Sequence, residues 1–457
     1  MQCSDKVGHR PYHPANDFGA ENCPYIVRIA PDETSFRFEW IPQKSQGPVT
    51  LYYGERGSGV FQELPVSTQT VTVSGLKTEV DYEFYLQTAN GQKSRVRLVR
   101  TGKNPEHAVV INYLHPEDEQ YAFSGRYLCS PSFVRLSSGR LVASMDVYGP
   151  NMAQNLMLLF YSEDNGVSWH YLTDLYPFYW GTLFVESNTL YCIGNTTEYG
   201  NLQIACSSDG GVRWSAPVTI FYGSNLLCPN GGVHHPPMQL VHHNGRIWMP
   251  TEYGSWNRGS HLPAVFSLKE GDDLMNAENW HVTGFLPFEG EWKKDAEGMQ
   301  KDTMEGSLIV SPDGTFYEYL RWNVGKALRL KINADDPDTL PEYDKLMEMP
   351  VSNSMFKIVP YQGRYLMATN RKKEGYEYGS QSPRHLLSLF ESEDLENWTL
   401  LKDVIDRSDA HPAQVGFQYP FLITEGKQVL LMIRSAYNGA HSYHDSNYML
   451  FVKETLQ

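Results

Sequence analysis

Two stretches of the chain decide its fold: SEDNGVSW at residues 162–169 and SSDGGVRW at residues 207–214. Both read Ser-x-Asp-x-Gly-x-x-Trp, and each follows an apolar run. In such a turn the Asp carboxylate caps the loop, the Gly adopts a φ that other residues resist, and the Trp folds back onto the hairpin. A motif that returns within one chain indicates an architecture built from repeated units.

This motif resembles the Asp-box, or BNR repeat, of sialidase-like β-propellers. The resemblance is specific because the chain carries two full copies, each with its Trp, and two degenerate copies follow at residues 273–280 and 392–398. It implies an all-β fold in which the Asp-boxes lie on the periphery of the blades. We therefore assign the Asp-box residues structural roles.

A weaker repeat runs through residues 108–457, where an apolar strand, a short turn and a second apolar strand recur six times. The turns are at residues 138–140, 187–189, 244–246, 313–315, 362–364 and 425–427. We predict a six-bladed β-propeller, with seven blades as the alternative. The last strand, 448–452, is expected to pair with residues 109–112, which would close the ring and remove an open sheet edge.

Residues 23–103 form a separate unit of alternating strands. Phe36–Trp40 alternates apolar and charged residues, as a half-buried strand does. Leu76 and Tyr82 resemble the tyrosine corner of fibronectin type III domains, with Trp40 as the core Trp of the opposite sheet. We predict a small β-sandwich that serves as a spacer or shoulder, with a sugar-binding module as the alternative.

The composition narrows the class of ligand. The formal net charge of −15 disfavours nucleic acid and anionic membranes as partners, and no apolar run is long enough to span a bilayer. The 29 Tyr, 20 Phe and 10 Trp suit an aromatic-lined site of the kind that binds glycans. No cofactor or metal is expected, and the oligomeric state is left open.

The six cysteines contain no Cys-x-x-Cys pair, so thiolate metal binding is not expected. We expect free, buried thiols, with one or two disulfides as the alternative. The N-terminus lacks a hydrophobic signal region, which predicts a protein that is either cytoplasmic or exported with its signal removed.

The innermost strand of each propeller blade starts near the central axis on one face. The residues just before the six apolar strands should therefore converge on one pocket. They are Cys129-Ser130, Tyr179-Trp180, His234-His235, Glu305, Asn353-Ser354 and Gln418-Tyr419.

The second half of the chain resembles the catalytic half of sialidases. The resemblance implies that Tyr419 is the nucleophile and that Glu305 removes its proton. It also implies that Arg321 and Arg384 are the second and third of three arginines that bind an acidic substrate. A phenol with a pKa of about 10 needs such a base to react near neutral pH.

The first half departs from the sialidase pattern. Cys129 stands where the first arginine is expected, and no carboxylate lies near residues 150–151, where the general acid is expected. Asp146 is the nearest carboxylate, and His235 is the other candidate for the acid.

We therefore predict an exo-acting glycosidase that acts on a glycan with an acidic sugar. Further candidate substrate-binding residues are Trp180, His234, Gln418 and Arg434, although the position of Arg434 after an apolar strand favours a structural salt bridge slightly over substrate contact. Two alternatives remain. One is a uronate-directed lyase that uses Tyr419, His235 and Arg321, and the other is a non-catalytic glycan-binding propeller.

Overall fold

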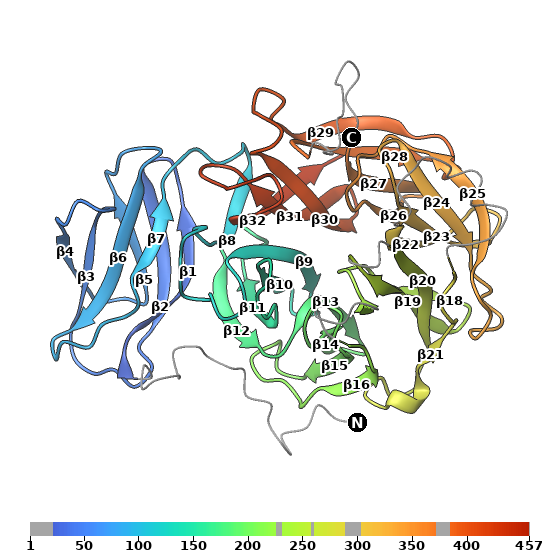
Figure 1. Ribbon diagram of the computed structural model, residues 1–457, viewed down its shortest axis with the longest axis horizontal. Helices are drawn as coiled ribbons and strands as arrows, with labels where there is room; N and C mark the ends of the chain where they lie inside the picture. Colours follow the sequence, from blue (N-terminus) through green and yellow to red (C-terminus); the bar gives the residue numbers. More distant parts are fainter. Residues whose placement is uncertain (1–21, 225–230, 257–259, 288–302, 372–383, 457) are drawn as a thin grey trace.

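The computed structural model describes residues 22–224, 231–256, 260–287, 303–371 and 384–456. Two β-structures lie side by side in Figure 1, a sandwich on the left and a ring of blades on the right. Residues 1–21, which include Cys3, lie outside the described residues, and so does Cys228.

The sandwich consists of two antiparallel sheets with the strand orders β1-β2-β5 and β4-β3-β6-β7. The first contains β1 (Tyr25–Pro31), β2 (Ser35–Ile41) and β5 (Thr70–Ser74). The second contains β4 (Gln62–Val66), β3 (Val49–Glu55), β6 (Asp81–Thr88) and β7 (Arg97–Arg100). Trp40 is buried, and the Tyr82 hydroxyl accepts the backbone N–H of Lys77 at 2.9 Å, which is the predicted tyrosine corner.

The described propeller residues form six antiparallel sheets, which confirms the predicted all-β, six-bladed fold. Blade 1 holds β9 (Tyr127–Arg135), β10 (Leu141–Tyr148), β11 (Leu156–Ser162) and β12 (His170–Leu175). Blade 2 holds β13 (Tyr179–Glu186), β14 (Thr189–Asn195), β15 (Leu202–Ser207) and β16 (Val218–Phe221). Blade 3 holds β17 (Gly232–His234), β18 (Val241–His243), β19 (Arg246–Ser255), β20 (Ser260–Lys269), the 3-10 turn η3 (Ala277–Asn279) and β21 (His281–Val282).

Blade 4 holds β22 (Met304–Val310), β23 (Phe316–Arg321), β24 (Lys326–Lys331) and β25 (Glu342–Glu348). Blade 5 holds β26 (Lys357–Tyr361), β27 (Arg364–Asn370), β28 (Leu386–Ser392) and β29 (Thr399–Asp406). Blade 6 holds β30 (Gly416–Glu425), β31 (Gln428–Ala436), β32 (Tyr448–Thr455) and β8 (Ala108–Tyr113).

Strand β8 closes the ring. It pairs antiparallel with β32, and Tyr448 lies opposite Tyr113 in this register. Strands from the two ends of the propeller sequence thus share one sheet, as Figure 1 shows. The predicted closure is confirmed, because β8 pairs with the edge of β32 that would otherwise be open.

The Asp-boxes have the expected turn chemistry. In the first box the Gly166 N–H donates to Ser162 Oγ at 2.8 Å, and the Ser168 N–H donates to Asp164 Oδ1 at 2.8 Å. Gly166 has a φ of +84°, and a Cβ atom there would lie 2.0 Å from the Phe451 ring. The box therefore fixes blade 1 against the neighbouring blade 6, a structural role.

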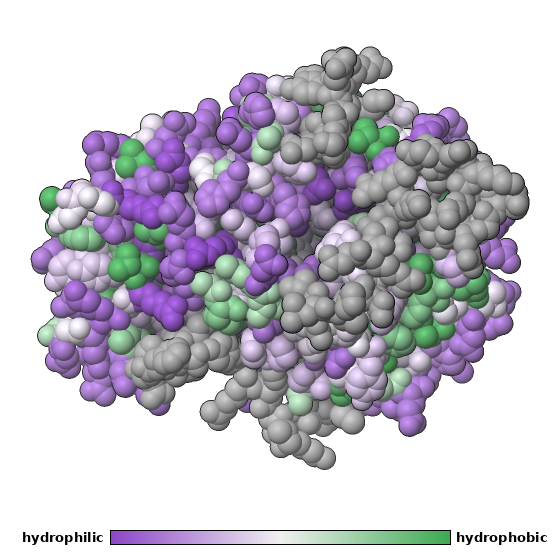
Figure 2. Space-filling view, viewed as in Figure 1, coloured by the Kyte–Doolittle hydropathy of each residue, from purple (hydrophilic) through white to green (hydrophobic). Residues whose placement is uncertain are grey.

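Buried arginines of the sandwich contact the propeller. Arg28 of β1 donates to the Ile111 and Val110 carbonyls of β8 at 2.6 and 2.8 Å. Arg97 of β7 forms a fully buried ion pair with Asp118, at 2.7 Å. The sandwich is thus joined to the strand that closes the ring. Its surface in Figure 2 is mostly hydrophilic, with separate hydrophobic residues.

Cys129 and Cys192 are free and buried, as expected, and Cys23 is free and partly buried. Cys206 is disulfide-bonded, so the expectation of free thiols is wrong at this position. The part of the chain that the structure describes has no helix with the length and apolarity to cross a bilayer.

Candidate active site

The innermost strands of blades 1, 2, 4 and 6 share a β-bulge at their axial ends. At each bulge two residues lie opposite one residue of the next strand. The first bulge residue has a left-handed φ without being glycine: Ser130 (49°), Trp180 (53°), Glu305 (59°) and Tyr419 (53°). Such residues cost about 1–3 kcal/mol each and concentrate at functional sites. The bulges turn these four side chains toward the axis.

The second bulge residue is always Gly or Pro, in the pairs Ser130-Pro131, Trp180-Gly181, Glu305-Gly306 and Tyr419-Pro420. Space explains the two glycines. A Cβ atom on Gly306 would lie 2.0 Å from Glu318 Oε1, and one on Gly181 would lie 2.2 Å from Met157 Sδ.

The second strands of blades 4 and 6 carry arginines at equivalent positions. Arg321 lies opposite Met304, one residue before the Glu305 bulge, and Arg434 lies opposite Gln418, one residue before the Tyr419 bulge. The register therefore places two guanidinium groups beside the two bulge residues. In blades 1 and 2 the same positions hold Asp146 and Asn195.

These elements enclose a cavity of about 440 Å³ at one end of the propeller axis. Its described polar lining comes from all six blades. The lining includes Tyr148, Gln154, Glu198, His234, Glu305, Arg321, Arg384, Tyr419, Arg434 and His444.

Tyr419 and Glu305 are in direct contact within this cavity. The Tyr419 hydroxyl donates to Glu305 Oε1 at 2.6 Å. Arg321 Nη1 donates to Glu305 Oε2 at 2.6 Å and to the Tyr419 oxygen at 2.9 Å. A phenol, a carboxylate and a guanidinium thus form one hydrogen-bonded unit, short enough for proton transfer from Tyr419 to Glu305.

Three guanidinium groups lie against Tyr419, with Arg321 at its hydroxyl. Arg384 and Arg434 lie over the Tyr419 ring, with their Cζ atoms 5.7 and 5.1 Å from its centroid. Arg384 Nη2 donates to the Asn353 carbonyl at 3.0 Å, and Arg434 Nη2 donates to the His444 carbonyl at 2.6 Å. Neither Arg384 nor Arg434 pairs with a carboxylate of the described residues, so both charges are available to an acidic ligand.

The pKa values of Glu305 and Tyr419 are shifted in opposite directions. Burial acts to raise the pKa of Glu305, but Arg321 and His234 and the hydrogen bonds to the carboxylate outweigh it, so the pKa falls below its usual value. Burial, and then the charge of Glu305, raise the pKa of Tyr419, against the three arginines. Glu305 is therefore ionised and Tyr419 is protonated near neutral pH, as a base and a masked nucleophile should be.

The opposite wall is aromatic. The Trp180 ring packs edge-on against His234, with 4.4 Å between the ring centroids. His234 Nδ1 lies 2.5 Å from Glu252 Oε2. Both Trp180 and His234 line the cavity, where they were expected as substrate-binding residues.

Two predicted catalytic residues do not line the cavity. His235 is fully buried and contacts Thr182, with His235 Nε2 3.3 Å from the threonine hydroxyl. Burial lowers the pKa of His235 to about 3, so the imidazole is neutral. Placing His235 in the pocket was wrong because the chain turns at Pro236-Pro237, and only His234 and the prolines face the cavity.

Asp146 is also fully buried, beneath the bulges. Its Oδ2 accepts the Trp180 N–H at 2.6 Å, and burial holds its pKa well above the usual range. Asp146 therefore supports the Trp180 bulge instead of reaching substrate. Gln418 is likewise buried outside the lining, where its side-chain oxygen accepts a hydrogen bond from Arg384 Nη1 and so positions that arginine.

Sequence reasoning missed Glu198, Gln154 and Tyr148, which line the cavity. Tyr148 ends the second strand of blade 1, and Gln154 and Glu198 lie in the connections between the second and third strands of blades 1 and 2. No repeat marks these positions. The paired bulges could have been found, because a polar or aromatic residue before Gly or Pro recurs at the start of four innermost strands.

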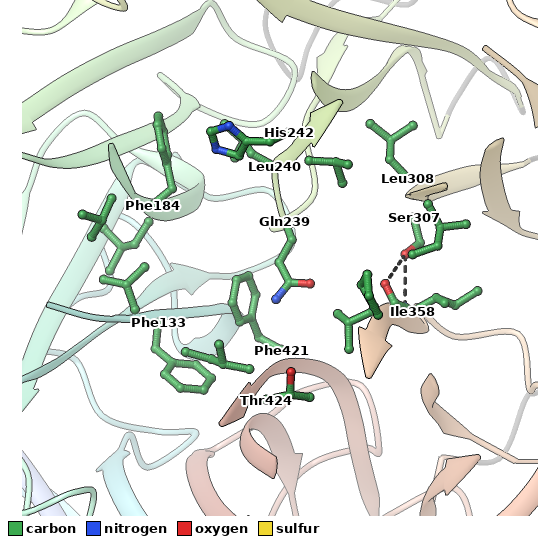
Figure 3. A pocket seen from close by; sticks show the side chains of 18 of the residues that line it. Phe133, Phe184, Gln239, Leu240, His242, Ser307, Leu308, Ile358, Phe421 and Thr424 are labelled. Carbon is green, nitrogen blue, oxygen red and sulfur yellow. Dashed lines mark hydrogen bonds between the residues drawn. The ribbon is translucent and has the colours of Figure 1, made fainter. Parts of the chain in front are cut away.

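The other end of the axis is apolar. A cavity of about 590 Å³ lies there, and Figure 3 shows Phe133, Phe184, Leu308 and Phe421 around it with Gln239 reaching into its middle. Residues 235–240 pass between the two cavities, since the prolines line one and Gln239 the other. Lys357 Nζ donates to the Pro237 carbonyl at 2.9 Å and holds this segment.

Comparison with known families agrees with this architecture. The model of the BNR repeat-like domain matches residues 179–431, which is more than half of the 457-residue chain. The chain belongs to the BNR repeat-like domain family. The fibronectin type III domain matches residues 24–100, so the predicted resemblance of both parts is confirmed.

Solved structures show the same fold as this BNR repeat-like protein. The Hadza microbial sialidase Hz136 is 14% identical with a TM-score of 0.51, and the match covers 98% of each chain. A mutant α-L-arabinofuranosidase from Fusarium graminearum, in complex with an iminosugar inhibitor, is 12% identical with a TM-score of 0.50. That match covers 76% of this chain and 98% of the other. No curated protein matches the sequence.

Proposed function

We propose that this protein is an exo-acting glycosidase that hydrolyses the bond between an acidic sugar and a glycan. The observation that carries the proposal is the unit formed by Tyr419, Glu305 and Arg321, in which the phenol donates to the carboxylate at 2.6 Å. In this unit the base is charged and the nucleophile keeps its proton until it attacks.

The arginines support an acidic substrate. Arg321, Arg384 and Arg434 come from blades 4, 5 and 6 and line one side of the cavity. Guanidinium groups bind carboxylates through two parallel hydrogen bonds, which gives both charge and orientation. Cys129 of blade 1 stands where the first arginine was expected. Arg434 supplies the third guanidinium group from blade 6 instead.

The mechanism follows from this placement. The arginines hold the carboxylate of the sugar and bring its anomeric carbon over the Tyr419 oxygen. Tyr419 attacks as its proton moves to Glu305, and the resulting glycosyl–tyrosine bond is hydrolysed by water in a second step. Two displacements at one carbon retain its configuration.

A lyase is less well supported. That alternative needed His235 beside Tyr419 and Arg321, and His235 is buried outside the cavity. No other observation favours elimination over hydrolysis.

The test is a screen of 4-methylumbelliferyl glycosides of sialic, uronic and other acidic sugars, with α-L-arabinofuranoside and neutral hexosides as comparison. We expect release of the fluorophore from an acidic glycoside, with retained configuration at the first product. Release from neutral glycosides alone would contradict the acidic substrate. A product with a new ultraviolet-absorbing double bond would show elimination, and binding without turnover would show a lectin.

A further inference from the structure

The cavity has two chemically different sides. Blades 4 to 6 contribute the three arginines, whereas blades 1 to 3 contribute Glu198, which stands in the connection between β14 and β15 of blade 2. Glu198 and Glu305 are the two carboxylates among the described residues that line the cavity. Since blade 2 faces blade 5 across a six-bladed ring, Glu198 lies across the axis from Arg384.

The side chains that hydrogen-bond to Glu198 are uncharged. Gln154 Nε2 donates to Glu198 Oε2 at 2.8 Å, and Trp256 Nε1 donates to Glu198 Oε1 at 2.9 Å. The Tyr179 hydroxyl in turn donates to Gln154 Oε1 at 2.7 Å. Within the described residues Glu198 forms no ion pair, and the residue is only 7% exposed.

The backbone around Glu198 forms a hydrogen-bonded turn. The Gly200 N–H donates to the Thr197 carbonyl at 2.8 Å, and Asn195 Nδ2 donates to the Gly200 and Val233 carbonyls, both at 2.9 Å. The carboxyl group is thus presented by a hydrogen-bonded loop and accepts hydrogen bonds from two side chains. Such preorganisation is what a proton donor requires to reach one substrate atom.

The environments of the two carboxylates differ in the way that separates a base from an acid. Glu305 is paired with Arg321, which favours its ionised form. Among the described residues Glu198 accepts hydrogen bonds from the neutral side chains of Gln154 and Trp256 and forms no ion pair. The two carboxyl groups of the cavity thus stand in different surroundings, one paired with a cation and one with neutral donors.

Resting on the function proposed above, we propose that Glu198 is the general acid of the reaction, with Gln154 and Trp256 as its positioning residues. The sugar carboxylate binds the arginine side, so the leaving group extends toward the opposite side, where Glu198 stands. This assignment fills the role that neither Asp146 nor His235 can take.

The proton balance closes over two steps. First, Glu198 gives its proton to the glycosidic oxygen while that oxygen leaves the anomeric carbon with the bonding electron pair. The Tyr419 oxygen bonds to the same carbon, and its proton passes to Glu305. Then a water oxygen attacks the anomeric carbon, its proton returns to Glu198, and the Tyr419 oxygen departs and regains the proton held by Glu305.

The experiment compares two glycosides of the sugar that the wild-type protein cleaves, a 4-nitrophenyl glycoside and a benzyl glycoside. The nitrophenolate leaves without protonation, whereas the benzyl alcohol needs an acid. Glu198→Gln should lower kcat/KM about 10²- to 10⁴-fold for the benzyl glycoside, but less than about 10-fold for the nitrophenyl glycoside. Glu186→Gln, on the same blade but at the other end of β13, should change neither value more than about twofold.

The ratio of the kcat/KM values for the two glycosides within one variant does not depend on the amount of folded protein. Sodium azide should also restore turnover of the nitrophenyl glycoside by Glu198→Ala, giving a glycosyl azide. Equal losses for both glycosides would overturn the assignment of Glu198, as would the same leaving-group signature in His234→Asn with none in Glu198→Gln. A wild-type protein that cleaves no glycoside would instead overturn the proposed function itself.

Discussion

The two ends of the propeller axis are built from the same innermost strands, yet one end is a charged cavity and the other is apolar. At the apolar end the strands pair regularly, as where Ile309 lies opposite Tyr317 and Ile423 opposite Leu430. At the charged end the pairing is broken by a bulge in four blades. Regular pairing keeps side chains alternating between the faces of a blade, whereas a bulge redirects one of them.

This difference shows which end of the fold is built for the proposed function. The apolar end needs only residues that suit a buried strand, while the charged end accepts backbone strain in order to bring Tyr419, Glu305 and the arginines together. Substitutions at matched positions of the two ends should therefore have very different effects.

The largest effect is expected at the nucleophile. Tyr419→Phe removes the attacking oxygen and should lower kcat by about 10³-fold or more. Tyr361→Phe, at the apolar end of β26, should leave kcat within about twofold of wild type. Steady-state kinetics on the best substrate of the screen measure both. Full hydrolytic activity in Tyr419→Phe would show that another group attacks.

A smaller effect is expected for the third arginine. Arg434→Met removes a charged donor from the substrate carboxylate, and a hydrogen bond to a charged group contributes about 1.5–3 kcal/mol. We expect kcat/KM for the acidic glycoside to fall about 10- to 150-fold. Arg135→Met, at the apolar end, removes an ion pair with Glu425 and should leave kcat/KM nearly unchanged. Equal losses in the two variants would indicate a structural role for Arg434.

The pH profile tests the electrostatics of the charged end. Because the pKa of Glu305 is lowered, its carboxylate should persist below the ordinary glutamate pKa of about 4.3. Activity should therefore be lost as pH falls only below that value, when protonated Glu305 can no longer accept the Tyr419 proton. The acid limb of kcat/KM against pH, which reports the ligand-free protein, measures this. An acid limb well above the ordinary glutamate pKa would mean that Glu305 is not held ionised.

The Asp-box comparison concerns stability instead of activity. Gly166→Ala places a methyl group in the Phe451 ring and imposes a left-handed φ on alanine, so it should cost about 2–4 kcal/mol of unfolding free energy. Gly139→Ala has a similar φ with open space around it and should cost only about 1 kcal/mol. Chemical denaturation measures the free energy of unfolding of the two variants. Equal losses in both would contradict a packing role for Gly166.

The scaffold could be predicted from the sequence because its signals are local. The Ser-x-Asp-x-Gly-x-x-Trp turns and the alternating strands depend on neighbouring residues, and so does the Tyr82 corner. The convergence of Glu305 and Tyr419 was also predictable once the strand starts were aligned, and Arg321 was predicted from the resemblance to sialidases.

The rest of the site depends on how the connections between strands fold over the cavity. His235 was misplaced because nothing in the sequence shows that the chain turns at Pro236-Pro237 and buries the imidazole. Glu198 was missed because it stands outside the repeat, and its hydrogen bonds to Gln154 and Trp256 join segments that are distant in sequence. Arg434 became interpretable only from its register opposite Gln418.

The most direct test of the account is to trap the covalent intermediate. A fluorinated glycosyl fluoride of the cleaved sugar should react with the protein, and peptide mass spectrometry should locate one added sugar on Tyr419. Glu305→Gln should slow the labelling, because the phenol then lacks its base. A sugar attached to Glu305 or Glu198, or turnover with inversion and no labelled peptide, would contradict the claim that the bulge at Tyr419 presents the nucleophile.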